Sequence, residues 1–110
     1  MGRDVLGEFE FMVLLAALRL GEDGAYALAI VDVIAQRTGR RVRRSAVYTT
    51  LKRLEDKGFV SSYLGEPRAE RGGKARRHIE VQPDGLRAVH ESRTAFEEMW
   101  GGLDTAAGAP

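Results

Sequence analysis

Cysteine is absent from this chain of 110 residues, and its absence excludes several kinds of chemistry. Without a thiol the chain forms no disulfide, carries no cysteine nucleophile and offers zinc no sulfur ligand. Small secreted domains usually depend on disulfides, so we expect a cytoplasmic protein rather than an exported one.

Histidine is scarce as well, and the sequence contains no motif for catalysis or cofactor binding. The two histidines, His78 and His90, are isolated from each other in the pattern. No metal-ligand spacing, phosphate-binding loop or pair of acids within a cleft-forming motif occurs. We therefore expect neither an enzyme nor a bound metal or cofactor.

Long apolar runs are also lacking. The run at residues 11–18 is far shorter than the roughly 20 residues that a membrane-spanning helix needs. Glu8 and Glu10 precede it and Arg19 follows it, which does not fit a signal peptide. We expect no membrane association. A chain of this length forms one domain that buries roughly 60–70% of its unfolded surface, so association with a second copy would add stability.

The charges nearly balance over the whole chain, but they are segregated along it. The net charge is +1. Residues 37–77 contain 13 basic and four acidic side chains, a net charge of +9, so the remaining residues sum to −8. A basic block next to an acidic remainder is typical of a nucleic-acid-binding surface.

The segment 45–60, SAVYTTLKRLEDKGFV, is the most informative part of the chain. Val47, Leu51 and Leu54 recur at helical spacing and, with the aliphatic part of Lys57, predict one buried helix face. The opposite face is polar and basic, and four arginines precede the helix at positions 40, 41, 43 and 44. A helix that begins this way suits phosphate and the major groove of DNA.

Periodicity and turn residues predict four helices and two strands. The predicted helices are Leu6–Leu20, Tyr26–Thr38, a third that Ser45 caps and that ends near Lys57, and a fourth from Pro83 to about Gly101. The predicted strands are Phe59–Leu64 and Arg77–Val81, joined by a wing at Gly65–Lys74. In the second helix, the residues expected to face the core are Leu28, Ile30, Val31 and Ile34. This order predicts a winged helix-turn-helix, mainly α with a small β wing.

The last predicted helix carries an apolar stripe that is typical of a coiled coil. The stripe consists of Leu86, Val89, Phe96, Trp100 and Leu103, and only Arg93 interrupts its three-four alternation. Such a helix either packs on its own domain or pairs with a second chain. We favour pairing, because a winged helix that reads a symmetric operator requires two copies. The first helix is apolar on almost all sides, so it too has a face to offer a partner.

These patterns divide the chain into three parts. Residues 1–81 are predicted to form a winged-helix DNA-binding domain, and residues 82–103 a C-terminal dimerisation helix. Residues 104–110 are rich in glycine and alanine, and we expect them to form a disordered tail.

A series of motifs occurs in a fixed order around the predicted recognition helix and beyond it. The series is Ala25-Tyr26, Tyr48, Leu51, Arg53-Leu54-Glu55, Gly58, Phe59, Val60, Gly72-Gly73 and Gly85. Together these motifs resemble the PadR-like transcriptional regulators over about residues 6–103, and most closely the small members with a single C-terminal helix. The chain departs from the family pattern at Thr49, where proline is frequent, at His78-Ile79, where paired tyrosines are usual, and at Gln82, which replaces a threonine cap. The operator sequence therefore cannot be inferred from relatives.

The resemblance implies a homodimeric repressor whose last and first helices form the interface and, in some members, a flat aromatic pocket for planar ligands. The candidates here for the dimer interface or ligand pocket are Phe9, Val13, Val89, Phe96, Trp100 and Leu103. An aromatic pair at helical spacing is also what a plain interface core contains, so a small aromatic effector is a hypothesis. Glu97 and Asp104 would favour cationic aromatic compounds.

The candidates for contact with double-stranded DNA fall into two groups. Arg41, Arg43 and Arg44, with the Ser45 hydroxyl, are expected to hold backbone phosphates. Lys52 and the methyl group of Thr49 are the candidates for reading base edges. The remaining candidates are Tyr48, Arg53 and the wing residues Lys74 and Arg76. The Tyr48 ring can pack under the wing while its hydroxyl meets a phosphate, or its role is mostly structural. Arg53 alternatively pairs with Glu55 or Asp32. We expect the operator to be palindromic.

Two other functions stay open at this point. One is a winged helix that binds protein as a subunit of an assembly, and the other is an architectural DNA-binding module with no effector. The protein-binding alternative predicts an apolar patch where the basic face lies, and the net charge of +9 over residues 37–77 argues against it.

Overall fold

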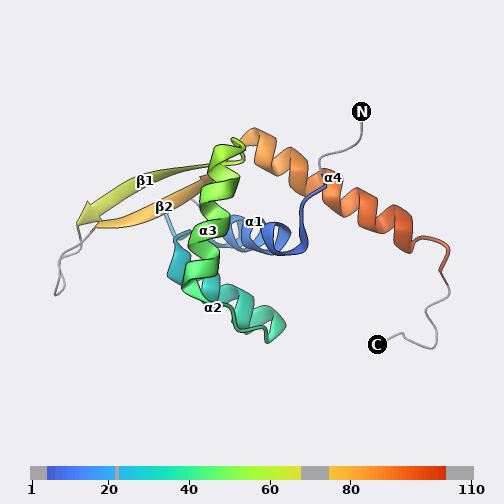
Figure 1. The fold of residues 1–110 in the computed structure, drawn as a ribbon, viewed down its shortest axis with the longest axis horizontal. Helices are drawn as coiled ribbons and strands as arrows, with labels where there is room; N and C mark the ends of the chain where they lie inside the picture. The colour runs from blue at the N-terminus through green and yellow to red at the C-terminus, as the bar shows by residue number, and fades with distance from the viewer. Residues whose placement is uncertain (1–4, 22, 68–74, 104–110) are drawn as a thin grey trace.

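Three helices, two strands and a fourth helix follow one another in the order of a winged helix. The computed structural model describes residues 5–21, 23–67 and 75–103, and within them lie four helices and one two-stranded antiparallel sheet (Figure 1). The elements are α1 (Glu8–Leu20), α2 (Ala27–Thr38), α3 (Arg44–Asp56), β1 (Val60–Pro67), β2 (Ala75–Val81) and α4 (Pro83–Trp100). The winged-helix fold predicted from the sequence is confirmed.

The helices α1, α2 and α3 pack into a bundle, and the strands and α4 extend from its opposite sides (Figure 1). The side chains that are fully buried between these helices include Val13, Leu14, Ile30, Val47 and Leu54. Burying a side chain of this size contributes about 1.5–3 kcal/mol relative to leaving it exposed. The predicted apolar face of the third helix is therefore the face that anchors α3 to the domain.

The two strands form an antiparallel ladder that is longer than the sequence indicated. Val60 lies opposite Val81 and Leu64 opposite Arg77, and the register shifts between Leu64 and Pro67. The hydrogen bonds of a ladder join backbone groups, whatever the side chains are. A ladder can therefore continue past the residues that alternate between apolar and polar. β1 begins at Val60 rather than at the predicted Phe59 and runs on to Pro67, into the predicted wing segment Gly65–Lys74. β2 begins at Ala75, two residues before the predicted Arg77.

Three other local predictions were wrong. α1 begins at Glu8 rather than Leu6, because Gly7 is still extended and its amide donates to Glu10. α3 begins at Arg44, so the capping position belongs to Arg43 and Ser45 lies inside the first turn, without a side-chain cap. Leu28 is 45% exposed instead of facing the core, because Ile30 and Ile34 define the buried face of α2.

The first half of α4 belongs to the core of the winged-helix domain. Ala88, Val89 and Ser92 are buried, and the Leu6 amide donates a hydrogen bond of 2.8 Å to the Ser92 hydroxyl. The dimerisation helix proposed from the sequence for residues 82–103 is thus continuous with the domain at its start. Phe96 still contacts Phe11 of α1, and the helix extends beyond the domain after it (Figure 1). Among the described residues, no helix is long and apolar enough to cross a membrane.

Gly85 is the point of closest approach between α4 and the rest of the chain. It is buried, and a Cβ at this position would overlap the Phe59 carbonyl group. The amide of Gln82 donates to the same carbonyl at 2.9 Å, which fixes the start of α4 against the segment between α3 and β1. The family resemblance at Gly85 therefore has a steric reason.

Gly85→Ala should destabilise the domain by about 1–3 kcal/mol, because α4 must move away from Phe59. The higher helix propensity of alanine, about 0.5–1 kcal/mol, offsets only part of that cost. Thr94→Ala, on the exposed side of the same helix, is the matched control and should change stability by less than about 0.5 kcal/mol. Thermal and urea unfolding would measure both. Equal stability of the Gly85→Ala variant and the parent would contradict the packing described here.

A partly buried ion pair joins the start of α1 to the end of α3. Lys57 Nζ donates to Glu10 Oε2 at 3.0 Å, and the Glu10 side chain is only 10% exposed. Burial by itself would raise the pKa of Glu10 above 4.5, but the hydrogen bonds from Lys57 and from the Gly7 amide, with the charges of Lys57 and Arg53, lower it overall. A carboxyl group whose pKa is lowered by folding stabilises the folded state above its unfolded pKa and loses this contribution as the pH falls.

Glu10→Gln should therefore lower the free energy of unfolding by about 1 kcal/mol at pH 7, since the charged hydrogen bond is lost. The difference from the parent chain should shrink as the pH falls through the lowered pKa of Glu10, because the parent then loses its carboxylate too. Glu8→Gln is the control, since Glu8 pairs with Arg40 on the surface and is 70% exposed. Urea unfolding at several pH values would measure this. A destabilisation of the same size at pH 3 and pH 7 would rule out the ion pair as its source.

Candidate nucleic-acid interface

The outward face of α3 consists of exposed polar, basic and aromatic side chains. The buried residues of the helix are Val47, Thr50, Leu51 and Leu54. The exposed candidates for DNA contact are Ser45, Tyr48, Thr49, Lys52 and Arg53. Tyr48 is 54% exposed, so about half of its surface is open to a ligand in the free chain. Helical spacing thus separates the two faces as the sequence predicted.

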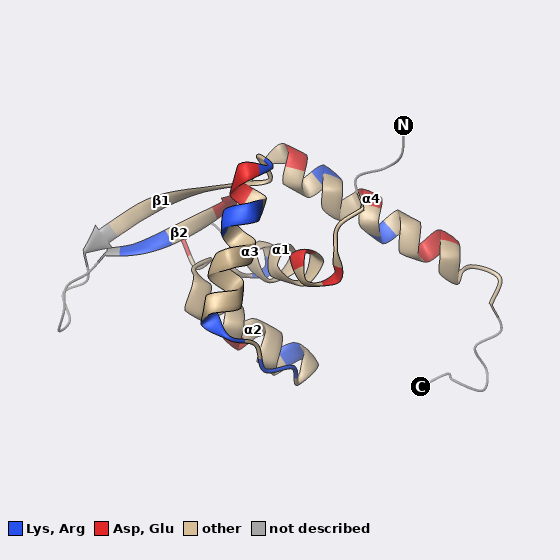
Figure 2. Ribbon diagram, viewed as in Figure 1, with Lys and Arg blue, Asp and Glu red and all other residues tan. Residues whose placement is uncertain are grey.

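The segment that leads into α3 is a run of exposed arginines. Arg41, Arg43 and Arg44 form no ion pair with any described residue, and Figure 2 shows basic residues along this segment and at the start of α3. Arg40 differs, because it pairs with Glu8 at 2.9 Å and lies over the Phe9 ring at 5.4 Å. The first amides of a helix have no partner within the helix and favour an anion. Three unpaired guanidinium groups beside such an end make a strongly electropositive site.

The two candidates for base contact are held differently. The Thr49 hydroxyl donates to the Ser45 carbonyl at 3.0 Å, which fixes the side chain and leaves its methyl group for an apolar contact. Lys52 Nζ pairs with Asp56 at 3.1 Å, and both side chains are more than 60% exposed. An exposed pair of this spacing stabilises a helix by only about 0.3–0.5 kcal/mol, so a stronger anion displaces Asp56 readily.

Arg53 lies nearer to α1 than the sequence indicated. Within the described residues it forms no ion pair with Glu55 or Asp32, the two partners weighed from the sequence. Its charge instead contributes to lowering the pKa of Glu10. Arg53 therefore adds positive potential between the outward face of α3 and the Glu10–Lys57 pair.

Polar contacts tie the strands to the end of α3. Arg77 Nη1 donates to the Ser62 hydroxyl at 3.0 Å, and the Ser62 hydroxyl donates to Glu55 Oε2 at 3.0 Å. This chain runs from β2 through β1 to α3. Arg76, on the other face of β2, lies over the ring of Tyr26 at 4.3 Å. Lys74, the other wing candidate, lies outside the described residues.

The partners of Lys52 and Arg76 were not predicted from the sequence. Asp56 is four residues from Lys52 on the same helix, and that spacing alone could have indicated the pair. Nothing comparable links Tyr26 to Arg76, because the contact depends on how β2 lies beside the start of α2.

In the part of the chain that the structure describes, no group of three or more His, Asp or Glu side chains could hold a metal ion.

The apolar face of α4 continues past the domain. Phe96 stacks on Phe11 of α1, with ring centroids 5.9 Å apart, yet remains 54% exposed. Met99 and Trp100 follow on the same side of the helix and are 78% and 65% exposed. Leu103, which is 62% exposed, lies beyond the end of α4 at Trp100, so the predicted helical stripe does not reach it. An apolar surface of this kind on a small domain is typical of an interaction site.

The remaining interface candidates lie within the chain's own core. Val13 and Val89 are 0% and 6% exposed, so their side chains are covered without a partner. Phe9 is partly buried beneath Arg40. The exposed part of the predicted set is therefore Phe96, Trp100 and Leu103, to which the structure adds Met99.

Two successive helices, of which α3 presents an exposed basic face, followed by a two-stranded wing, are the arrangement of a winged-helix DNA-binding protein. The model of the PadR-like family of transcriptional regulators matches residues 14–91. This match covers more than half of the chain, and the chain belongs to that family. No curated protein sequence matches the chain.

Solved structures of similar fold agree with this assignment. A PadR family transcription regulator from Clostridium difficile R20291 is 16% identical, with a TM-score of 0.71, and the match covers 86% of this chain and 92% of that chain. A PadR family transcriptional regulator from Eggerthella lenta is 25% identical, with a TM-score of 0.66 and coverage of 86% and 81%. PadR from Bacillus subtilis, solved in complex with operator DNA, is 20% identical, with a TM-score of 0.64 and coverage of 76% and 45%.

Proposed function

We propose that this chain is a cytoplasmic, homodimeric repressor that binds a palindromic operator through α3 and the wing. The observation that carries the proposal is the set of unpaired arginines at the start of α3, beside an outward face with Thr49 and Lys52. Phosphate contacts would come from Arg41, Arg43, Arg44, the Ser45 hydroxyl and the wing cations Lys74 and Arg76. Base reading would come from Lys52, suited to guanine acceptors, and from the Thr49 methyl group, suited to thymine.

Tyr48 and Arg53 complete the proposed surface. Tyr48 is exposed on α3, where its hydroxyl can donate to a phosphate. Arg53 is exposed near the far end of the helix and adds attraction for the backbone. The Bacillus subtilis relative was solved with operator DNA, which supports the choice of DNA as the partner. The protein-binding alternative predicted an apolar patch at this place, and the exposed side chains that lead into α3 are cationic.

The dimer in this proposal rests on the exposed end of α4. Phe96, Met99 and Trp100 continue the face that Ala88 and Ser92 bury, so a second copy would cover them by the same packing that holds the first half of the helix. Leu103, just beyond the helix, would add to the covered surface. A symmetric interface of this kind pairs like with like. Two copies would place two α3 helices in successive major grooves of one operator.

An aromatic effector at this interface is a further part of the proposal. The rings of Phe11 and Phe96 are nearly parallel, at 4°, and Trp100 lies one helical turn beyond Phe96. In the single chain Phe96 and Trp100 are more than half exposed, so an enclosed ligand pocket would require the second copy. A planar compound could then stack between aromatic rings. The alternative without an effector is a dimer with the same residues packed against each other.

Lys52→Ala and Arg43→Ala should weaken DNA binding in different ways. With a duplex selected from a random pool and its scrambled counterpart, Lys52→Ala should reduce discrimination by about 1–3 kcal/mol and leave non-specific affinity nearly unchanged. Arg43→Ala should weaken both duplexes alike and lower the salt slope by about 1. Fluorescence anisotropy over a salt series would measure both effects.

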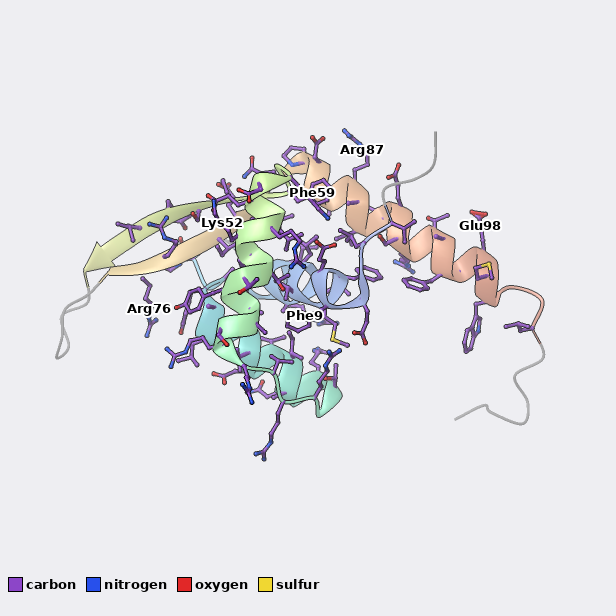
Figure 3. All side chains as sticks on the ribbon, in the orientation of Figure 1. Phe9, Lys52, Phe59, Arg76, Arg87 and Glu98 are labelled. Atoms are coloured by element: carbon purple, nitrogen blue, oxygen red, sulfur yellow. The ribbon has the colours of Figure 1, made fainter. Side chains whose placement is uncertain are left out.

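Arg87→Ala is the matched control for these two variants. Arg87 is an exposed arginine on α4, paired with Asp84 at 2.9 Å, and it points away from the bundle (Figure 3). Its removal should leave DNA affinity unchanged. If Lys52→Ala weakened both duplexes equally, Lys52 would be a phosphate contact and the proposed base reading would be refuted.

Met99→Glu and Trp100→Glu should each shift the protein toward monomer, with the dimer dissociation constant rising at least ~10-fold, because a charge would be buried without a partner. Thr94→Glu is the control, since Thr94 lies on the exposed side opposite the stripe. Analytical ultracentrifugation would measure the change. A parent chain that sediments as a monomer, or glutamate variants that remain dimers, would overturn the proposed pairing.

A further inference from the structure

An aromatic cluster lies where the wing meets the helix-turn-helix. His78 of β2 stacks on Tyr63 of β1, with centroids 5.3 Å apart, and meets the Tyr26 ring edge-on at 6.0 Å. Tyr63 and His78 are directly opposite each other in the strand register. The Arg76 guanidinium lies over the Tyr26 ring, with its carbon 4.3 Å from the ring centroid. One tyrosine, placed just before α2, thus contacts two alternate residues of the wing strand.

The backbone holds this arrangement in place. The Ile79 amide donates to the Ala25 carbonyl at 2.7 Å, so the residue before Tyr26 is bonded to β2. Ile79 itself is buried in the core, and residues 76 and 78 lie on the other face of the strand by alternation. The position of the Tyr26 ring relative to β2 is therefore set by the core of the domain rather than by the wing tip.

Stacking leaves the hydrogen-bonding capacity of Arg76 available. A guanidinium group is planar, and its five N–H donors lie in that plane. A tyrosine ring whose centroid is 4.3 Å from the guanidinium carbon restricts how the group turns, and no described residue accepts a hydrogen bond from the Arg76 side chain. Figure 3 shows Arg76 leaving β2 toward the side of the molecule where α3 begins. The edge of the guanidinium is thus free to meet an oxyanion near the arginines that precede α3.

We propose that Tyr26 is a positioning residue for DNA binding: its ring holds the Arg76 guanidinium so that the in-plane donors meet a backbone phosphate. The inference rests on the proposed function, because Arg76 is assigned there to a phosphate. It adds a residue that itself lies outside the recognition helix and the wing. The Tyr26–Arg76 contact fixes the distance between the wing cation and the arginines at the start of α3, which grip the DNA at separate points.

A double-mutant cycle on DNA binding tests this role. Tyr26→Leu should weaken binding to the selected duplex about three-fold and lower the salt slope toward that of Arg76→Ala. Tyr26→Phe keeps the ring and should bind as the parent does. In the Arg76→Ala background, Tyr26→Leu should have no further effect, because the residue that it positions is gone. An equal loss in both backgrounds, or no loss in either, would overturn the inference and leave Tyr26 with a packing role.

Two further measurements test the planar shape of the Arg76 guanidinium on DNA and, without DNA, its contact with the Tyr26 ring. Arg76→Lys retains the charge but not the planar fork, so we expect about three-fold weaker binding with an unchanged salt slope. Parent-like affinity of that variant would overturn the inference. In the DNA-free protein, nuclear magnetic resonance should show the Arg76 side-chain protons shifted by the Tyr26 ring current. The shift should vanish in Tyr26→Leu and persist in Tyr26→Phe.

The outcomes separate the inference from the proposed function. A parent chain that binds DNA, without coupling between Tyr26 and Arg76, would overturn only the inference. A parent chain that does not prefer any duplex would overturn the proposed function and the positioning role together, even if the ring-current shift is observed. Thermal unfolding of each variant identifies any change that comes from loss of the fold.

Discussion

The burial of one face of α3 is the constraint on which the rest of the structure depends. Val47 and Leu54 are fully buried against the other helices of the bundle, and Leu51 nearly so. Because a helix has a fixed period, burying these positions leaves Thr49 and Lys52 with no place except the surface. The same packing places the start of the helix, with its free amides and flanking arginines, at the edge of the domain. The proposed DNA surface is thus a consequence of how the core is filled.

A second constraint acts at the other end of the chain. Gly85 lets α4 approach the Phe59 backbone, and this contact sets the direction in which the helix leaves the domain. The apolar side of α4 begins as part of the core and ends as an exposed stripe. The domain covers only the first half of this continuous apolar face, and the exposed second half favours association with a second copy. The fold and the proposed dimer therefore share one helix face.

Much of this organisation could be predicted from the sequence, because it depends on period and on turn residues. The spacing of Val47, Leu51 and Leu54 identified the buried face of α3, and Pro83 marked the start of α4. Family membership and the winged-helix fold were predicted correctly from motifs in order. The N-cap was placed wrongly because Ser45 is a good capping residue by type, whereas the backbone extends only up to Arg43.

Contacts between residues far apart in the chain could not be predicted in this way. Glu10 and Lys57 are separated by 47 positions, and their pairing depends on α1 and α3 crossing at a particular angle. Leu28 is apolar, as core residues are, but it lies on the exposed side of α2. Tyr26 and Arg76 meet only because β2 bonds to the segment before α2. Periodicity identifies a face, and tertiary packing decides what covers it.

The most direct test of the central claim is fluorescence anisotropy of the purified protein on the DNA upstream of its own gene, against a scrambled duplex, over a salt series. If α3 and the wing read DNA sequence, binding to the upstream DNA should be tighter than binding to the scrambled duplex. Affinity should also fall by about 10³-fold or more between 50 and 200 mM salt, as expected for about six phosphate contacts. No preference between the duplexes, together with a shallow salt slope, would contradict the account and favour a winged helix that binds protein.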